Sequence, residues 1–175
     1  MFILQTLMDF KAQGFVRNIG VSVYDADQIK RILELFTPDL VQLPFNVFDQ
    51  RLLNDGTITR LRSQGCAVHA RSIYLQGLLL TPSQGWPDWV DPAAKSHHAR
   101  LEQFALDCHR TLLECVLGFV CAQQELEAAV VGVCSVSQLK ELLLVWGQIS
   151  PWTHDEWRGW SMDNPTILDP RHWPR

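Results

Sequence analysis

The chain has 175 residues, of which 47% are hydrophobic and 19% charged, and its formal net charge is −4. This apolar fraction is sufficient for a packed core, and the acidic balance excludes the electrostatic footprint of a dedicated nucleic-acid binder. No stretch approaches the ~18 consecutive apolar residues that cross a bilayer, and the first residues lack the basic region of a secretory signal. We therefore expect a cytoplasmic protein with no membrane partner, comprising one domain or a piece of a larger one.

The cysteines fit that compartment. There are five of them, an odd number, and no two have the spacing CxxC. A disulfide framework or a structural zinc site is therefore not expected, and most of these thiols should be small buried groups. Cys66 and His69 share one short segment and could offer two metal ligands, but the sequence shows no second pair to complete a site. We expect no bound metal.

The first half of the chain alternates predicted helices and strands. Three short apolar segments predict strands, over residues 15–22, 40–43 and 66–71. Periodic apolar residues predict a helix before the first strand, over residues 2–13. Asp25 is placed to cap a second helix that Pro38 ends, and Asp55 with Gly56 begins a third that runs through Leu61 and is closed by Gly65.

The second half begins with an irregular segment. Residues 80–95 hold three prolines and two tryptophans, which predicts a surface excursion whose aromatic rings pack on the body. Residues 99–124 predict helix, broken near Leu117 and Gly118. Residues 129–133 predict the last strand, and Ser135 is placed to cap the helix that follows it. The tail from Gly147 is rich in Trp and Pro, has little periodicity, and should wrap over the body.

The order of these elements predicts an α/β fold. Strands buried on both faces and alternating with helices form parallel sheets with right-handed crossovers. Four βα units are half of an eight-stranded (β/α) barrel, which normally needs ~250 residues. The pattern therefore favours the second half of a TIM barrel with about four parallel strands, and a four-stranded open sheet is the alternative. A half barrel would leave a sheet edge unpaired, near residues 15–22, which favours self-association.

Four passages, in order and with the right spacing, resemble the C-terminal half of the aldo/keto reductases. They are KAQGFVRNIGVS (residues 11–22), VQLPFN (41–46), the segment 65–79 with its A-x-S and G-L-L, and the segment 132–141 with its G-x-x-x-x-x-Q-L-x-E. NVFDQRL (46–52) and RSIYLQG (71–77) are similar to a bacterial branch often linked with surface-polysaccharide gene clusters. The resemblance implies a partial barrel over residues 1–146, with residues 147–175 as a C-terminal tail or lid.

The resemblance also implies that this half binds a nicotinamide cofactor, NADP or NAD. By position, Ser22 and Gln42 would hydrogen-bond the nicotinamide carboxamide. Arg71 stands where many relatives have an aromatic ring that stacks on the nicotinamide, and a guanidinium can stack or meet a phosphate. Ordinary surface or capping roles are the alternatives for these side chains. Six further residues are implied to border the pyrophosphate and the adenosine: Ser72, Leu75, Gly77, Gly132, Gln138 and Glu141.

Three departures leave the choice between NADP and NAD open. Val23 stands where an asparagine is expected, and Leu142 stands where the adenine motif ends in asparagine. Relatives commonly bind the ribose 2′-phosphate with a basic residue, and its position falls near Cys134, which is uncharged. The family's catalytic Asp, Tyr, Lys and His would all precede Met1, so no residue here inherits a catalytic role. His69 is the tempting substitute, but a structural role is favoured.

The resemblance therefore implies an oxidoreductase that transfers hydride to or from a small carbonyl or alcohol substrate. The chain as given would be the cofactor-binding fragment, inactive alone. The alternative is a truncated, non-catalytic relative that binds a nicotinamide nucleotide or a partner protein.

Overall fold

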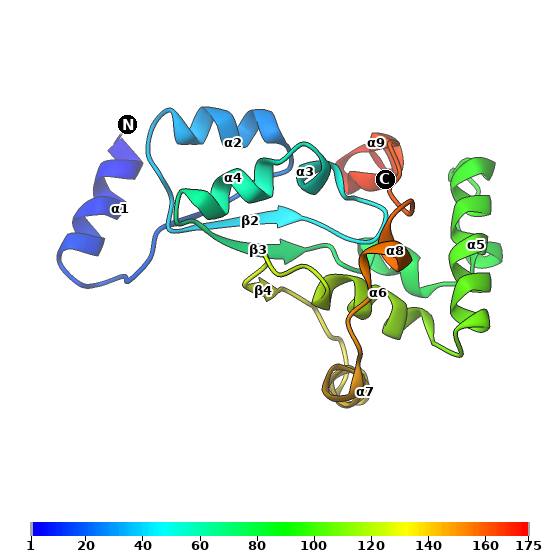
Figure 1. The fold of residues 1–175 in the computed structure, drawn as a ribbon. Coiled ribbons are helices and arrows are strands. Elements are labelled where there is room, and N and C mark those ends of the chain that lie inside the picture. Colours follow the sequence, from blue (N-terminus) through cyan, green and yellow to red (C-terminus); the bar gives the residue numbers. More distant parts are fainter. Residues whose placement is uncertain (1, 175) are drawn as a thin grey trace.

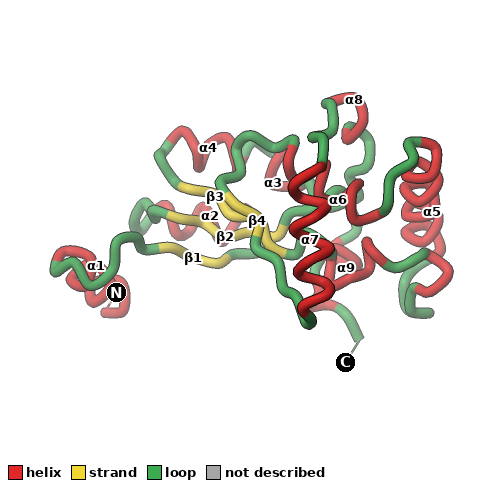
Figure 2. The backbone as a smooth tube through the Cα atoms, turned by 90° about the horizontal axis from the view of Figure 1, so that it is seen from below, coloured by secondary structure: helices red, strands yellow, loops and turns green. Residues whose placement is uncertain are grey.

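A parallel sheet organises the chain, and the computed structural model describes residues 2–174 of it. The strands lie side by side in chain order (Figures 1 and 2) and are β1 (Gly20–Ser22), β2 (Leu40–Pro44), β3 (Ala67–Arg71) and β4 (Ala128–Ala129). All three pairings are parallel, which confirms the predicted α/β class. The outer edges of β1 and β4 pair with no other strand among residues 2–174.

The two outer strands are much shorter than the sequence predicted. The expected strand over residues 15–22 is reduced to β1, and the one over 129–133 is replaced by the two-residue β4. The inner strands β2 and β3 extend over five residues each. A strand is maintained by backbone hydrogen bonds to its neighbours, and an outer strand has a neighbour on one side only. Both outer segments have the apolar pattern of a strand, but each has a neighbouring strand on one side only among the described residues.

Helix α2 (Ala26–Leu33) follows the outer strand β1, and helices α3 (Arg51–Asn54) and α4 (Thr57–Ser63) follow the inner strand β2. Helix α1 (Phe2–Ala12) precedes β1 and stands apart from the sheet (Figures 1 and 2). As predicted, the Asp25 carboxylate caps α2 by accepting a hydrogen bond from the Gln28 backbone N–H at 2.8 Å. Asp55 likewise accepts from the Thr57 N–H at 2.8 Å, just before α4. Short polar side chains thus determine where these helices begin.

The predicted helix break near Leu117 and Gly118 is wrong. The structure has two helices, α5 (Pro92–Asp107) and α6 (Leu112–Cys121), and α6 runs through both residues without interruption. The chain turns earlier, at His109 with φ of 54°, and Thr111 then caps α6. Gly118 has a packing role, because a Cβ there would come within 2.6 Å of the Trp152 ring.

The last elements are α7 (Val136–Gln148), α8 (His154–Trp157) and α9 (Pro165–Leu168), with short 3₁₀ turns η1 (Leu75–Leu80), η2 (Ser83–Gly85) and η3 (Pro170–His172). The Ser135 hydroxyl accepts from the Gln138 N–H at 3.2 Å, the predicted cap of α7. In the tail, Trp152 is buried, and the Met162 N–H donates to the Phe48 carbonyl at 2.8 Å. The tail therefore packs on the body, while the boundary at 146/147 stays a prediction; Met1 and Arg175 lie outside the described residues.

The core is centred on β2, β3 and α6. The side chains of Leu43, Phe45 and Val68 are fully buried, and the Phe45 ring stacks on that of Phe119 with centroids 5.2 Å apart. Trp86, from the irregular segment predicted to be a surface excursion, is itself buried and donates its ring N–H to the Leu78 carbonyl at 2.9 Å. No helix within residues 2–174 combines the length and apolar character needed to cross a membrane.

Candidate functional site

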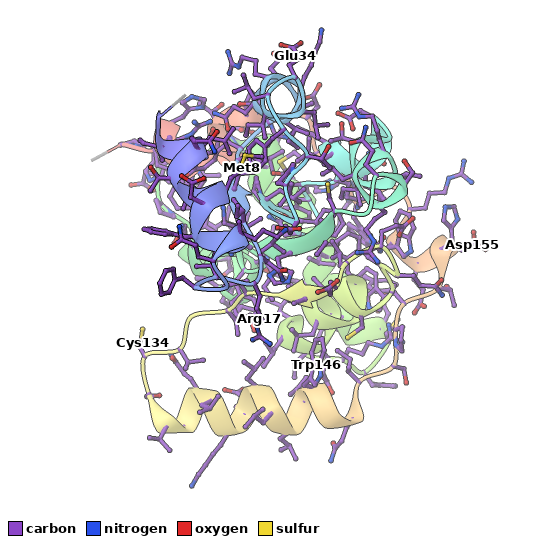
Figure 3. All side chains as sticks on the ribbon, turned by 90° about the vertical axis from the view of Figure 1, so that its left-hand side faces the viewer. Met8, Arg17, Glu34, Cys134, Trp146 and Asp155 are labelled. Atoms are coloured by element: carbon purple, nitrogen blue, oxygen red, sulfur yellow. The ribbon has the colours of Figure 1, made fainter. Side chains whose placement is uncertain are left out.

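A cavity of about 640 Å³ lies between the loop that follows β3 and the segment that leads from β4 into α7. Its wall comprises residues of the 72–80 loop, the extended segment 130–134, and the first turns of α7, with Leu113 from α6. Small-molecule sites typically have volumes of ~300–1,000 Å³. In Figure 3, Cys134 marks the corner where the extended segment turns into α7, and Leu142 and Val145 of this helix pack against the core.

Five of the predicted cofactor residues line this cavity: Ser72, Gly77, Gly132, Gln138 and Glu141. They come from two segments far apart in the sequence, and the parallel order of β3 and β4 brings their loops to the same end of the sheet. Their assignment to a cofactor stays a prediction, but the structure places them together.

The other four predicted residues lie outside the lining. Leu75 is fully buried beneath the loop, so its side chain supports the wall rather than forming it. Ser22 is the last residue of β1 and is paired in register with Gln42, the middle residue of β2. Arg71 ends β3 and donates from Nη1 to the Ser72 hydroxyl at 3.2 Å, so it borders the cavity without lining it.

The backbone of the 72–77 loop is unusual. Ser72, Leu75 and Gln76 have φ of 58°, 46° and 55°, and Gly77 has φ of 93°. Left-handed backbone is costly for residues other than glycine and persists where the surroundings over-determine it, commonly at ligand clamps.

Side chains from the rest of the body hold this loop in place. The Asn46 amide donates to the Ser72 carbonyl at 3.2 Å, and the Trp86 ring N–H donates to the Leu78 carbonyl. The His98 Nε2 lies 3.2 Å from the Leu79 carbonyl oxygen, a position from which it donates. The wall on the β3 side is therefore preorganised by the core.

The opposite wall depends on the start of α7. The Gln138 Oε1 accepts from the Cys134 N–H at 2.7 Å, while its own N–H donates to Ser135. This reciprocal cap holds the turn at Cys134. Gly132, just upstream, has no atom within 4 Å of the place where a Cβ would stand, so the backbone there is open to a ligand.

Tyr74 and Glu141 both line the cavity and interact electrostatically. Burial, with a smaller contribution from the Glu141 carboxylate, raises the pKa of Tyr74 to about 12. The phenol is therefore protonated at neutral pH and available as a hydrogen-bond donor. No lysine or arginine is among the lining residues within the described chain.

Beside the cavity, a tyrosine ring is contacted by two guanidinium groups. The Arg71 Cζ lies 4.2 Å from the centroid of the Tyr24 ring, and the Arg171 Cζ lies 3.7 Å from it. Arg171 is paired with Asp169, whose pKa it lowers through their hydrogen bonds. Arg71 also donates to the Val23 carbonyl at 3.0 Å but has no ion pair with any residue in the range 2–174. Its charge remains available to a ligand.

Sequence reasoning located Tyr24 and Tyr74 in the cofactor-side motifs but assigned them no role, and it did not single out Arg171. Tyr24 and Tyr74 each follow a strand end, which is the signal that would have marked them. Arg171 belongs to the aperiodic tail, and nothing local in the sequence indicates that it reaches Tyr24.

The tentative metal pair is separated by the strand geometry. Cys66 is fully buried, which raises its pKa, whereas the His69 Nε2 points toward Glu127 at 4.0 Å. Among residues 2–174, no group of three or more His, Cys, Asp and Glu side chains is placed to hold a metal.

Two curated proteins are similar to this chain over most of its length. Over 145 residues it is 27% identical to L-galactose dehydrogenase of Arabidopsis thaliana. The matched stretch covers 79% of this chain and 44% of that protein. Over 150 residues it is 25% identical to the NADH-specific methylglyoxal reductase of Escherichia coli strain K12, which covers 77% of this chain and 45% of that protein. The chain thus spans about half the length of these relatives.

The fold of this chain matches somewhat more than half of the length of related solved structures. An aldo-keto reductase from Bacillus halodurans in its apo form superposes with a TM-score of 0.73 at 18% identity, covering 95% of this chain and 58% of that one. The holo form of the same protein gives a TM-score of 0.73 and covers 57% of that chain. The model of the aldo/keto reductase family matches residues 2–160. The chain therefore belongs to the aldo/keto reductase family, and its four parallel strands form part of that family's barrel.

Proposed function

We propose that this chain is the cofactor-binding half of an oxidoreductase that transfers hydride between NADP or NAD and a small carbonyl or alcohol substrate. The observation that carries the proposal is the cavity at the ends of β3 and β4, where residues from two distant segments, predicted to bind a nicotinamide cofactor, line one space. The names of the two curated relatives, a dehydrogenase and a reductase, support the reaction class.

The lining of the cavity fits part of an elongated dinucleotide. Gly132 leaves its backbone open, and the left-handed loop around Gly77 offers main-chain groups at the other wall. We assign Ser72 and the 75–77 loop to the pyrophosphate, and Gln138 and Glu141 to the adenosine. Close approach of backbone to phosphate is a recurring reason for glycine at such positions.

We assign the nicotinamide end to β1, β2 and the end of β3, beside the cavity. Ser22 and Gln42 lie beside each other there, and the Arg71 guanidinium stands between the Tyr24 ring and Ser72. When bound, the cofactor supplies the hydride chemistry. The residues of this chain orient it: an amide and a hydroxyl hold the carboxamide, and the arginine meets the ring or a phosphate.

None of these residues is assigned an acid or base role, and we propose that this chain alone is inactive. NADPH or NADH oxidation with simple aldehydes should show no turnover above background. Robust turnover would contradict the assignment of the catalytic residues to another part of the barrel. The cytoplasmic location remains a prediction.

Binding of nucleotide to the chain tests the proposal directly. Gly132→Leu places an apolar side chain into open space in the cavity, so it should leave the fold intact and block the nucleotide. Gly147→Leu is the matched control, because Gly147 also has open space around it but lies outside the cavity. Saturable binding of NADH or NADPH that is lost only in Gly132→Leu supports the proposal. Absence of saturable binding to the unaltered chain contradicts it.

A second candidate is a non-catalytic module that pairs with a second copy of itself. The observation that favours it is the pair of unpaired sheet edges, on β1 and β4, together with apolar side chains exposed on α7, where Leu143 is 61% exposed. A two-fold axis parallel to the strands would bring the β1 edge of each copy against the β4 edge of the other, closing a ring of parallel strands.

Sedimentation of the full chain over a range of concentrations tests the pairing. Self-association that Leu143→Lys with Leu144→Lys reduces would support it, because both side chains are exposed on α7. Leu106→Lys is the control, since Leu106 is as exposed but lies on α5. A monomer at every concentration would rule the ring out.

A further inference from the structure

The side chain of Asn46 is fully buried in the loop that follows β2. A buried amide needs hydrogen-bond partners, because an unpaired polar group is costly in the core. The Asn46 Oδ1 accepts from two backbone N–H groups of its own loop, those of Phe48 at 3.0 Å and Asp49 at 2.9 Å. These two donors fix the orientation of the amide, and its NH2 group is left to serve another loop.

That NH2 group extends the hydrogen bonding between β2 and β3 past the end of β2. The Phe45 N–H donates to the Arg71 carbonyl at 2.9 Å, as backbone groups do in a parallel sheet. One residue further on, the Asn46 backbone N–H turns back to the Asp49 carbonyl, and the Asn46 amide donates to the Ser72 carbonyl at 3.2 Å. A side chain therefore ties the loop after β2 to the loop after β3.

Ser72 is a residue whose backbone needs such support. It lines the cavity and has φ of 58°, in the left-handed region that residues with a side chain rarely adopt. Its carbonyl also accepts from the Leu75 N–H at 2.9 Å, which closes the turn into η1. The hydrogen bonds from Trp86 and His98 act later in the loop, so Asn46 supports the point where the loop leaves β3.

We infer that Asn46 is a positioning residue for the dinucleotide site. By holding the Ser72 carbonyl, it keeps the loop after β3 in the left-handed conformation that presents Ser72 and Gly77 to the cavity. The inference rests on the proposed function and goes beyond it, because Asn46 does not line the cavity and acts on a ligand only through Ser72.

The physical reason is the population of the binding conformation. Without the Asn46 donor, the backbone of Ser72 is free to relax toward the right-handed or extended regions that residues with a side chain prefer. A site whose binding conformation is only fractionally populated binds its ligand more weakly by that fraction. Loss of the donor should therefore weaken nucleotide binding even when the chain stays folded.

Asn46→Asp tests this with the least change of shape. It keeps the oxygen that accepts from Phe48 and Asp49, and it replaces the donating nitrogen with an oxygen that repels the Ser72 carbonyl. We expect NADH and NADPH, each titrated into the full chain and followed by nicotinamide fluorescence, to bind about tenfold more weakly. Asn46→Ser lacks the donor without adding a charge, and it replaces Asn46→Asp if thermal melts show that the buried carboxylate prevents folding.

Gln50→Glu is the matched control. Gln50 is a buried amide in the same loop, and it donates to the Val47 carbonyl at 2.7 Å. The substitution also replaces a buried donor with an oxygen, but it leaves the hydrogen bond to Ser72 in place. It should lower the melting temperature as Asn46→Asp does, and nucleotide affinity should change by less than about twofold.

Ser72→Gly provides a rescue experiment, because glycine adopts left-handed backbone without the penalty that serine has. Removing the hydroxyl will itself alter binding, so the comparison is made within each background. Asn46→Ser should weaken nucleotide binding less in the Ser72→Gly chain than in the unaltered chain.

Three results would overturn the inference while the proposed function stands. They are unchanged nucleotide affinity in a folded Asn46 variant, an equal loss of affinity in Gln50→Glu, and no rescue by Ser72→Gly. If neither nucleotide binds the unaltered chain, the proposed function is wrong as well, and the inference falls with it.

Discussion

Two βα regions of this chain have the same sequence pattern and very different packing. Around β2 and β3, the side chains of Leu43, Phe45 and Val68 are fully buried. Around β4 and α7, the strand extends over two residues, and no residue of the helix is buried. Each inner strand has two neighbours in the sheet, whereas β4 has one. Apolar patterning therefore specifies which side chains a segment is able to bury, and the elements that lie next to it decide whether they are buried.

The candidate cavity lies between these two regions, so its two walls differ in how firmly they are packed. Its β3 wall is held by Asn46, Trp86 and His98, all three of them buried residues. Its α7 wall depends on one cap and on a helix with apolar residues on most sides, of which Leu142 and Val145 pack against the core but none is buried. A helix with apolar residues all round is normally covered by other elements. One wall is thus preorganised by the core, and the other should gain stability when a ligand or a partner covers it.

The largest expected effect separates the two regions by stability. Phe45→Ala removes a fully buried ring stacked on Phe119, and it should lower the free energy of unfolding by ~3–5 kcal/mol. Leu143→Ala, on the exposed face of α7, should change it by less than ~0.5 kcal/mol. Urea unfolding of both variants measures the contrast. Similar losses at the two positions would show that α7 is packed as firmly as the core.

Amide hydrogen exchange compares the regions within one molecule. The N–H groups of β2 and β3 should exchange at rates set by global unfolding, and those of α7 much faster, because local opening of α7 exposes little apolar surface. NADH at a hundred times its dissociation constant should add ~2.7 kcal/mol of stability, with α7 gaining protection. Equal protection of α7 and β3 without ligand would remove the distinction between the two walls.

Two glycines sharpen the comparison further. Gly118→Ala puts a methyl group within 2.6 Å of the Trp152 ring and should cost ~1–3 kcal/mol by overpacking. Gly147→Ala, in α7, meets no atom within 4 Å and should stabilise the helix by up to ~1 kcal/mol. Thermal melts of the two variants should therefore shift in opposite directions. A stabilised Gly118→Ala would mean that the tail is not docked on α6.

The smallest effect concerns α1, a second poorly supported element. The Lys11 ammonium contacts the Asp39 carboxylate at 2.5 Å, and the Ile19 N–H donates to the same carboxylate at 2.7 Å. The hydrogen bond from Lys11, followed by that from Ile19, lowers the pKa of Asp39 below 3.8. A carboxylate whose pKa is lower in the folded chain than in the unfolded chain stabilises the fold at pH values above its ordinary pKa. That stability is lost as the pH falls through the folded-state pKa.

Because both side chains of the pair are partly exposed, Asp39→Asn should cost less than ~1 kcal/mol at pH 7. The difference between Asp39→Asn and the unaltered chain should shrink as the pH is lowered past 3.8, which unfolding curves at several pH values measure. Lys11→Gln should reduce the pH 7 stability by a comparable amount, and the double variant by little more. A difference that does not change with pH would contradict the assigned pKa shift.

The sequence by itself determined the local features of this protein. The caps at Asp25 and Ser135 and the positions of β2 and β3 all follow from short-range chemistry, because a cap bonds within three residues and a strand pattern repeats every two. The ordered motifs through residues 5–145 were sufficient to indicate the family, which the match over residues 2–160 confirms.

Only the tertiary structure decided the long-range features. The short outer strands, the unbroken α6 with Trp152 over Gly118, and the contact of Arg171 with Tyr24 each depend on a partner distant in sequence. Helix and strand periodicity and helix capping depend on residues close together in the sequence. Strand pairing and side-chain packing depend on which distant segments meet after the chain has folded.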